Sequence, residues 1–216
     1  GRNMKNPFSG SIIRLSLEEL LEVIVKDPSL HSRWLLTLSY LENCGARKIS
    51  EFQSIFKGQV PLEVLQHAWE ESRHAYFMKK QISKLELDPD QTRNFLGGTK
   101  AKNLLYLLDI KILKLLKEKG VQKKEELFYG AYLLTTYAIE KRADWLYNTY
   151  QKVLEKNDSK INLKLIIKEE ENHLKEIEEN IDKNRIISLL KPDSIEIESN
   201  IFSKFLSKIE EEIFLT

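Results

Sequence analysis

Two short motifs constrain this chain more than any other feature of its sequence. Glu71 stands three residues before His74, and Glu170 stands three residues before His173. On an α-helix, residues three apart lie side by side on one face, so the carboxylate and imidazole of each pair can reach the same metal ion. Two such Glu-x-x-His pairs predict a helical protein with a site for two metal ions.

Each pair is preceded by a further glutamate at a matched distance. Glu42 lies 29 residues before Glu71, and Glu140 lies 30 residues before Glu170. Clusters of turn-forming residues fall midway in both spans, at 57–61 and 156–159. Residues of two antiparallel helices lie at the same height only when the turn falls midway between them, and each glutamate would lie roughly 20 Å from its turn at 1.5 Å per residue. We therefore expect four carboxylates and two imidazoles to meet halfway along a four-helix bundle.

Cap signals and apolar periodicity predict the remaining helices. Ser16 begins a capping box for a short first helix, and Asp27 followed by Pro28 predicts the start of the next. The bundle helices are expected at 28–56, from 62 to a stop at 87–90, at 124–156 and at 160–183. Residues 85–123, with a helical run at 101–119, would carry the chain from the second bundle helix to the third.

The expected fold class is all-α. The chain is long enough for one domain, over residues 1–216, with the bundle core at 28–182 and extra helices at both ends. Residues 193–214 have the pattern of an amphipathic helix, which would either cover the bundle or pair with another subunit.

The composition excludes several classes of protein. Lys and Arg, 34 in all, nearly balance 33 Asp and Glu, so no net field favours nucleic acid or an anionic membrane. The single cysteine, Cys44, excludes an internal disulfide and a rubredoxin-type iron site. The first ten residues lack the apolar core of a signal peptide, and no apolar run reaches the length of a membrane span. We expect a cytoplasmic protein without nucleic-acid or membrane partners.

The complete pattern resembles the ferritin-like di-iron carboxylate superfamily over residues 28–182. The residues that carry the resemblance are Glu42, Glu71, His74, Glu140, Glu170 and His173. It implies two iron ions, with manganese or a mixed iron–manganese pair also possible, and carboxylates and imidazoles without a thiolate suit these metals. In the family the glutamates of the two Glu-x-x-His pairs bridge the metals, the upstream glutamates are terminal or bridging, and each histidine is one nitrogen ligand per metal.

The residues next to Glu71 and His74 show which members of the superfamily the chain resembles most. Glu70, Arg73 and His74 fit the acidic-Glu-x-Arg-His motif of acyl-carrier-protein desaturases and bacterial multicomponent monooxygenases, in which the acidic residue and the arginine support the histidines. Asn172 departs from this motif, because it stands where the second pair of those enzymes has arginine. The chain looks nearer to these enzymes and to ribonucleotide reductase small subunits than to cage ferritins.

Three further residues share the inward faces of the predicted helices. His67, four residues before Glu71, is either a third nitrogen ligand, a proton relay or a hydrogen-bonded core histidine. Asp144, one turn after Glu140, is either an outer hydrogen-bond acceptor or a surface carboxylate paired with lysine. Tyr137 either has a redox role, like the tyrosine of ribonucleotide reductase small subunits, or packs in the core.

Gly45 marks a possible substrate site. It follows Glu42 by three residues and removes a side chain beside the metals, at a helix-propensity cost of about 1 kcal/mol. This loss either leaves a pocket, shared with Thr136 and Tyr137, or allows close packing.

The resemblance implies a di-iron oxidoreductase that activates dioxygen or peroxide to oxidise a small organic substrate. Electrons would come from a separate donor protein, and we expect a homodimer. Two alternatives stay open. One is iron handling, as a ferroxidase or a rubrerythrin-like peroxidase, and the other is a helical interaction module without metal.

Overall fold

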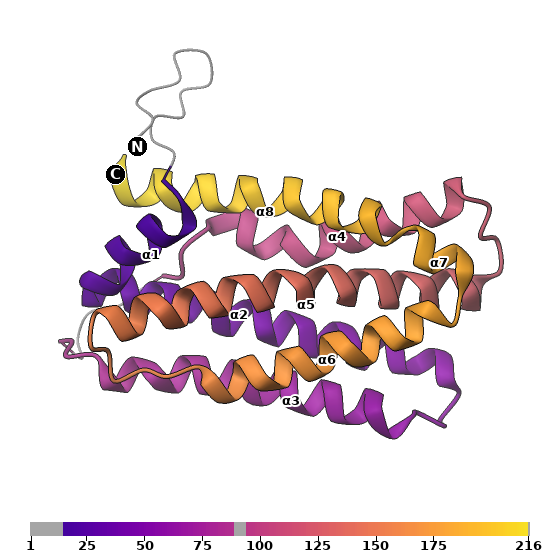
Figure 1. The fold of residues 1–216 in the computed structure, drawn as a ribbon, viewed down its shortest axis with the longest axis horizontal. Helices are drawn as coiled ribbons and strands as arrows, with labels where there is room; N and C mark the ends of the chain where they lie inside the picture. The colour runs from indigo at the N-terminus through magenta and orange to yellow at the C-terminus, as the bar shows by residue number, and fades with distance from the viewer. Residues whose placement is uncertain (1–14, 89–93, 216) are drawn as a thin grey trace, which may run out of the picture.

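The computed structural model describes residues 15–88 and 94–215, and every regular element within these ranges is helical (Figure 1). The α-helices are α1 Leu17–Lys26, α2 Pro28–Phe52, α3 Leu62–Lys80, α4 Gly98–Glu118, α5 Lys124–Lys156, α6 Lys164–Asp182, α7 Arg185–Leu189 and α8 Lys191–Phe214. Two 3-10 turns, Gln53–Phe56 and Gln81–Lys84, extend α2 and α3. The prediction of an all-helical protein is confirmed. In the described ranges no helix is long and apolar enough to cross a membrane.

The first two helices begin at the predicted cap residues. The Ser16 hydroxyl accepts a hydrogen bond from the backbone N–H of Glu19, and the Glu19 carboxylate accepts one from the backbone N–H of Ser16. Asp27 ends α1 and caps α2, where its side chain accepts the backbone N–H of Ser29 and Pro28 occupies the first position. Each cap stabilises its helix by about 1 kcal/mol because it pairs N–H groups that have no partner inside the helix.

Three predicted helices are longer than the observed α-helices. The α-helical part of α2 ends at Phe52, and the following 3-10 turn stops at Lys57, whose φ of 52° is left-handed. Helix α6 begins at Lys164 rather than at 160, because the Asn162 side chain accepts the backbone N–H of Lys164 and so favours a turn. The predicted stop at 87–90 falls partly outside the described residues, and α3 has already ended at Lys80.

Helices α2 and α5 lie in the middle of the molecule, between α3 and α6 on one side and α4 and α8 on the other (Figure 1). Helices α2 and α3 make one antiparallel hairpin and α5 and α6 make another, and the two hairpins lie side by side (Figure 1). Helix α4 lies in the connection between the hairpins and packs against α5, α2 and α8. The short helix α1 packs against α2 and α5.

One apolar core lies between the two hairpins and the helices that pack against them. Its most deeply buried members come from α1 to α6 and from α8, and include Ile24, Leu35, Met78, Leu108, Leu154, Ile181 and Phe205. Burying a side chain of this size contributes roughly 1.5 to 3 kcal/mol. The core therefore fixes the hairpins and the covering helices relative to one another.

An ion pair fastens α8 to α5. The Nε and Nη2 atoms of Arg142 donate to both carboxylate oxygens of Glu198, at 2.9 and 2.7 Å, and the Glu198 side chain is buried. The guanidinium also stacks over Phe202, 4.1 Å from the ring centre. Of the two predictions for the C-terminal helix, covering the other helices of its own chain is therefore observed.

Candidate metal centre

The side chains predicted as ligands converge halfway along α2, α3, α5 and α6. All are at most 7% exposed, and they are Glu42 from α2, Glu71 and His74 from α3, Glu140 from α5, and Glu170 and His173 from α6. Burying several carboxylates together costs much free energy unless positive charge compensates them.

The ligand atoms fall into two groups, each of which could hold a metal ion. The groups are Glu42, Glu71, His74 and Glu170, and His67, Glu71, Glu140 and His173. Within each group, one oxygen or nitrogen atom per residue lies within 4.8 Å of the others. Because Glu71 belongs to both groups, one carboxylate can bridge two neighbouring ions.

One nitrogen of each predicted histidine ligand faces the carboxylates. In the first group, Nδ1 of His74 lies 2.8 Å from Oε1 of Glu170. In the second, Nδ1 of His173 lies 3.4 Å from Oε1 of Glu71 and 3.5 Å from Oε1 of Glu140. Apart from Oε1 of Glu140, none of these atoms makes a hydrogen bond to any residue that the structure describes, although buried polar atoms normally have a partner.

The other nitrogen of each ring has a partner from the opposite hairpin. Nε2 of His74 donates to Oε2 of Glu169 at 2.6 Å, and Nε2 of His173 donates to Oε2 of Glu70. Arg73 donates to the same Glu169 oxygen. These outer partners fix the orientation of each ring and leave Nδ1 directed at the cluster, an arrangement that needs either a proton on Nδ1 or a metal ion.

His67 lies inside the second group. Its Nε2 is 3.1 Å from Oε1 of Glu140 and 3.3 Å from Oε1 of Glu71, and its Nδ1 is 3.2 Å from the hydroxyl of Tyr132. These contacts are those of a hydrogen-bonded core histidine, and the position of Nε2 within the second group would also suit a third nitrogen ligand. The corresponding position in the other half is Ile166, so the two groups are not equivalent.

Tyr147, which the sequence analysis did not single out, contacts the cluster. Its hydroxyl donates to Oε1 of Glu42, and its side chain is 4% exposed. Seven residues separate it from Glu140, and seven residues are nearly two full turns, so the two side chains point within roughly 20° of each other. That spacing is the signal by which Tyr147 could have been found.

Tyr137 and Asp144 have their described contacts elsewhere. The Tyr137 ring lies under Lys141 and Lys191, at 5.9 and 5.8 Å from their amino groups. The Asp144 carboxylate accepts the side-chain N–H of Asn148, one turn along the same helix, at 3.2 Å. Among the contacts of the described residues, neither side chain touches one of the proposed metal ligands. Both side chains point further away from the direction of Glu140 on α5 than the side chain of Tyr147 does.

Burial and the neighbouring charges shift the pKa values of the cluster. Burial raises the pKa of Glu42, and the charge of Glu71 adds to this effect, so that it reaches about 8. Burial lowers the pKa of His74 and of His173, but the surrounding carboxylates outweigh burial and raise each to about 12. The same balance raises the pKa of His67 to about 9. Without a cation, the imidazoles therefore carry the compensating protons.

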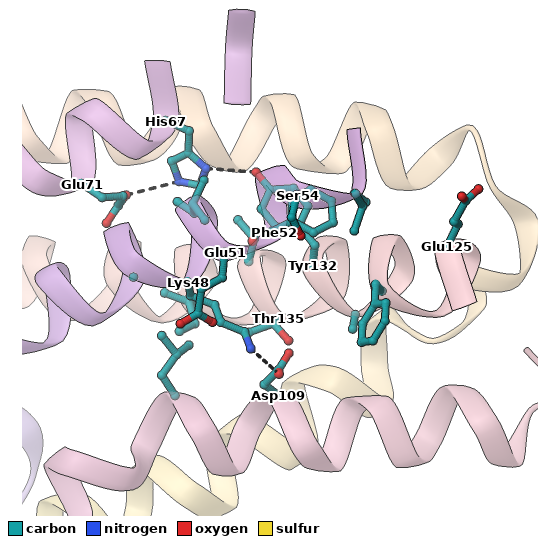
Figure 2. Close-up of a pocket in the computed structure, with 18 of the residues that line it drawn as sticks. Lys48, Glu51, Phe52, Ser54, His67, Glu71, Asp109, Glu125, Tyr132 and Thr135 are labelled. Carbon is teal, nitrogen blue, oxygen red and sulfur yellow. Dashed lines mark hydrogen bonds and ion pairs between the residues drawn. The ribbon is translucent and has the colours of Figure 1, made fainter. Parts of the chain in front are cut away.

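A cavity of about 510 Å³ adjoins the second group (Figure 2). His67, Glu71 and Glu140 form part of its lining, together with Gly45 and Thr136. A Cβ atom at Gly45 would lie 3.5 Å from Oε2 of Glu71, so the glycine keeps the space beside this carboxylate free. The predicted pocket at Gly45 and Thr136 is present, whereas Tyr137 is not part of its lining.

The chain thus combines two overlapping groups of buried ligands with an adjoining cavity. Carboxylate oxygens and imidazole nitrogens at these positions suit divalent iron, manganese or zinc. None of the protein families, curated proteins and solved structures compared with this chain matches it.

Proposed function

We propose that this chain is a ferritin-like di-iron carboxylate oxidoreductase that activates dioxygen or peroxide to oxidise a small organic substrate. The observation that carries the proposal is the shared position of Glu71 between two buried ligand groups beside a cavity. Manganese, or one ion of each metal, would suit the same donors.

One ion would be held by the group containing Glu42 and His74, the other by the group containing Glu140 and His173, with Glu71 common to both. His67 would offer the second ion an additional nitrogen donor, and this would make the two ions chemically different. When bound, the metal pair supplies the redox chemistry with dioxygen that protein side chains lack.

The alignment of the central atoms supports a metal ion. Nδ1 of His74 and Oε1 of Glu170 are 2.8 Å apart, within hydrogen-bonding distance, yet neither atom makes a hydrogen bond within residues 15–88 and 94–215. A hydrogen bond would require the N–H to point at the oxygen. A nitrogen and an oxygen that lie this close without forming a hydrogen bond are expected where the lone pairs of both atoms point at a third atom. The ligand atoms of one metal ion have this arrangement.

The outer partners would tune the metals. Glu169 and Glu70 hold one histidine each through Nε2, and Tyr147 holds Glu42 through its hydroxyl. Such contacts keep the donors in position before the ion arrives and make the imidazoles more basic ligands. We further propose that electrons come from a separate protein, because a single cysteine provides no iron–sulfur or rubredoxin-type centre.

A second candidate function, iron handling, is favoured by a groove between α3 and α6. The groove measures about 330 Å³ and reaches His67 and His173, and its carboxylates are Glu63, Glu70, Glu169, Glu176 and Glu179. Clustered negative charge raises the local concentration of divalent cations. A ferroxidase or a peroxidase would use this groove and have no need of the apolar cavity.

Metal stoichiometry and oxygen consumption test the proposal. Protein loaded anaerobically with ferrous iron should bind two ions per chain by elemental analysis, with a Mössbauer spectrum of a coupled pair after oxidation. Oxygen uptake that depends on an added organic substrate and a reductant would support the oxidoreductase, whereas rapid uptake with ferrous iron alone would support iron handling. Fewer than one ion per chain, with Glu71→Ala unfolding like the wild type, would overturn both in favour of a metal-free interaction module.

A further inference from the structure

Helix α3 exposes a stripe of large apolar side chains on the side turned away from the metal ligands. Leu62, Leu65, Trp69 and Tyr76 are 46 to 77% exposed, so no part of the chain that the structure describes covers them. The helix lies at the edge of the molecule, with α2 and α6 as its neighbours (Figure 1). Single apolar residues are common on protein surfaces, whereas a continuous row of them indicates an interaction surface.

The stripe has the spacing of a coiled-coil seam. Its positions are alternately three and four residues apart, and they are Leu62, Leu65, Trp69, Ser72, Tyr76 and Lys79. A seam with this spacing can face one partner helix along its whole length, which is about 28 Å for the 19 residues of α3. The kind of partner that fits the stripe is therefore another helix.

The seam is complementary to a second copy of itself in the antiparallel orientation. If a two-fold axis passes between residues 70 and 71, Trp69 of each copy would face Ser72 of the other. Leu65 of each copy would face Tyr76 of the other, because both positions are equally far from the axis. A large side chain thus meets a small one beside the axis, and apolar side chains meet further out. Each contact occurs twice, as in every interface with two-fold symmetry.

The surface of α3 also has a hollow that suits this pairing. It measures about 400 Å³ over the C-terminal half of the helix, and part of its lining comes from Arg73, Tyr76, Phe77 and Lys80. These residues follow the first of them by three, four and seven positions, which is the set that surrounds one inserted side chain when two helices pack. In the antiparallel pairing the side chain opposite this hollow would be Leu65 of the second copy. One helix face therefore carries both the protrusion and the hollow that receives it.

The charges along this face favour the antiparallel orientation. At the N-terminal end of α3, three carboxylates and one amino group line the groove next to α6, from Glu63, Lys175, Glu176 and Glu179. The C-terminal end and the 3-10 turn after it expose the amino groups of Lys79, Lys80 and Lys84. Antiparallel copies would bring each acidic end to a basic end, whereas parallel copies would bring lysines to lysines.

We propose that this chain forms a homodimer through the α3 stripe, with the two copies of α3 antiparallel about an axis between residues 70 and 71. A buried aromatic side chain removes about 200 Å² from water, so Trp69 and Tyr76, 61 and 64% exposed, would together bury about 250 Å² per copy. The rings of both copies thus supply about 500 Å² of the roughly 1,200 Å² at which specific interfaces begin. The leucines and the charged side chains at both ends provide the remainder. The dimer does not depend on the proposed function, because the metal ligands of α3 point to the opposite side of the helix.

Analytical ultracentrifugation of the full chain tests the dimer. The wild type at micromolar concentration should sediment as a species of about 51 kDa, twice the chain mass of 25.4 kDa. Tyr76→Glu places a carboxylate at two symmetry-related positions in the interface, so it should raise the dissociation constant of the dimer about 100-fold or more. Tyr106→Glu on α4 is the matched control, because Tyr106 has the same 64% exposure, and it should dimerise like the wild type. A monomeric wild type would overturn a second copy as the partner, and equal dissociation constants in the two variants would overturn the stripe as the interface.

Charge reversal tests the orientation of the two copies. Glu63 and Lys80 lie on the same flank of the stripe and near opposite ends of α3, so the antiparallel dimer would bring them together across the interface. Glu63→Lys and Lys80→Glu should each weaken the dimer about three- to tenfold, and the double variant should restore it. Single variants without effect, or a double variant no tighter than the single ones, would overturn the antiparallel arrangement.

Metal analysis of the same samples separates this proposal from the proposed function. Tyr76 is exposed and points away from the ligands, so monomeric Tyr76→Glu should keep the metal content of the wild type. A wild-type dimer that takes up no metal would support the interface and overturn the di-iron function. A wild-type monomer that binds two ions per chain would overturn the interface and leave the metal centre standing.

Discussion

Glu71 is common to both ligand groups, so a change at this position should affect both metal ions at once. Glu71→Gln keeps the shape of the side chain and removes the charge with which a carboxylate bridges two cations. Glu42→Gln and Glu140→Gln each alter one group only. We expect two ions per chain in the wild type, one in each of the latter variants, and close to none in Glu71→Gln.

The size of the effect on thermal stability follows from linkage. An ion present at 100 times its Kd stabilises the folded chain by about 2.7 kcal/mol. An unfolding entropy of about 2.1 cal/mol/K per residue amounts to about 0.45 kcal/mol/K over 216 residues. Each ion should therefore raise Tm by about 6 °C, giving about 12 °C for the wild type, about 6 °C for Glu42→Gln and Glu140→Gln, and almost no change for Glu71→Gln.

The assay is differential scanning calorimetry of each variant with chelator and with anaerobic ferrous iron, so that every variant is compared with its own metal-free form. Glu178→Gln is the matched control, because Glu178 lies on α6 and pairs with Lys141 outside the cluster. It should keep the wild-type shift. A full shift in Glu71→Gln would refute the shared carboxylate, and the absence of a shift in the wild type would refute the metal centre itself.

Three further predictions concern pH, the outer partners and the α8 anchor. In metal-free protein the pKa of Glu42 is raised to about 8 and that of His67 to about 9. The folded protein therefore holds these protons more tightly than the unfolded chain does, and the stability that they contribute is lost as pH rises through these values. The free energy of unfolding, measured in urea, should fall between pH 6 and pH 9. Metal affinity should change in the opposite direction, because ions displace these protons. Glu169→Gln should weaken metal binding by about 10- to 100-fold in a competitive chelator titration, since His74 loses its charged acceptor. Arg142→Met should cost about 3 to 5 kcal/mol in urea unfolding, because it leaves a buried carboxylate on α8 without its cation.

Each of these predictions has an outcome that contradicts it. Metal-free stability that rises from pH 6 to pH 9 would show that the protons are not held as described. Glu171→Gln, on the exposed face of α6, is the control for Glu169→Gln, and equal losses in both would remove the case for an outer partner. A cost below about 1 kcal/mol for Arg142→Met would place the ion pair among weak surface contacts.

The sequence predicted those parts of the cluster that depend on spacing within one hairpin. The closely matched separations of 29 residues from Glu42 to Glu71 and 30 residues from Glu140 to Glu170, with a turn midway, are enough to bring these carboxylates to one height. The cap at Asp27 was predictable for a similar reason, because capping is a local interaction. Amphipathicity showed that the C-terminal helix buries one face, but periodicity alone does not identify the helices that cover it.

Contacts between the hairpins were the part that spacing did not reveal. The placement of His67 depends on Glu140, which arrives from α5 at the same height. Glu169 could have been recognised, because it precedes Glu170 as Glu70 precedes Glu71, but its role depends on α3 and α6 facing each other. A helical wheel shows which residues share a face and contains no information about the neighbouring helix.

The exchange of outer partners between α3 and α6 also has a consequence for assembly. Glu70 on α3 accepts a hydrogen bond from His173 on α6, and Glu169 on α6 accepts one from His74 on α3. A shift of either hairpin by one helical turn would therefore break both hydrogen bonds together. Neither hairpin alone carries the complete donor set for both ions. If the two groups bind an ion pair as proposed, its uptake would report that two segments about a hundred residues apart in the chain have docked in their native alignment, and metal content would measure correct folding.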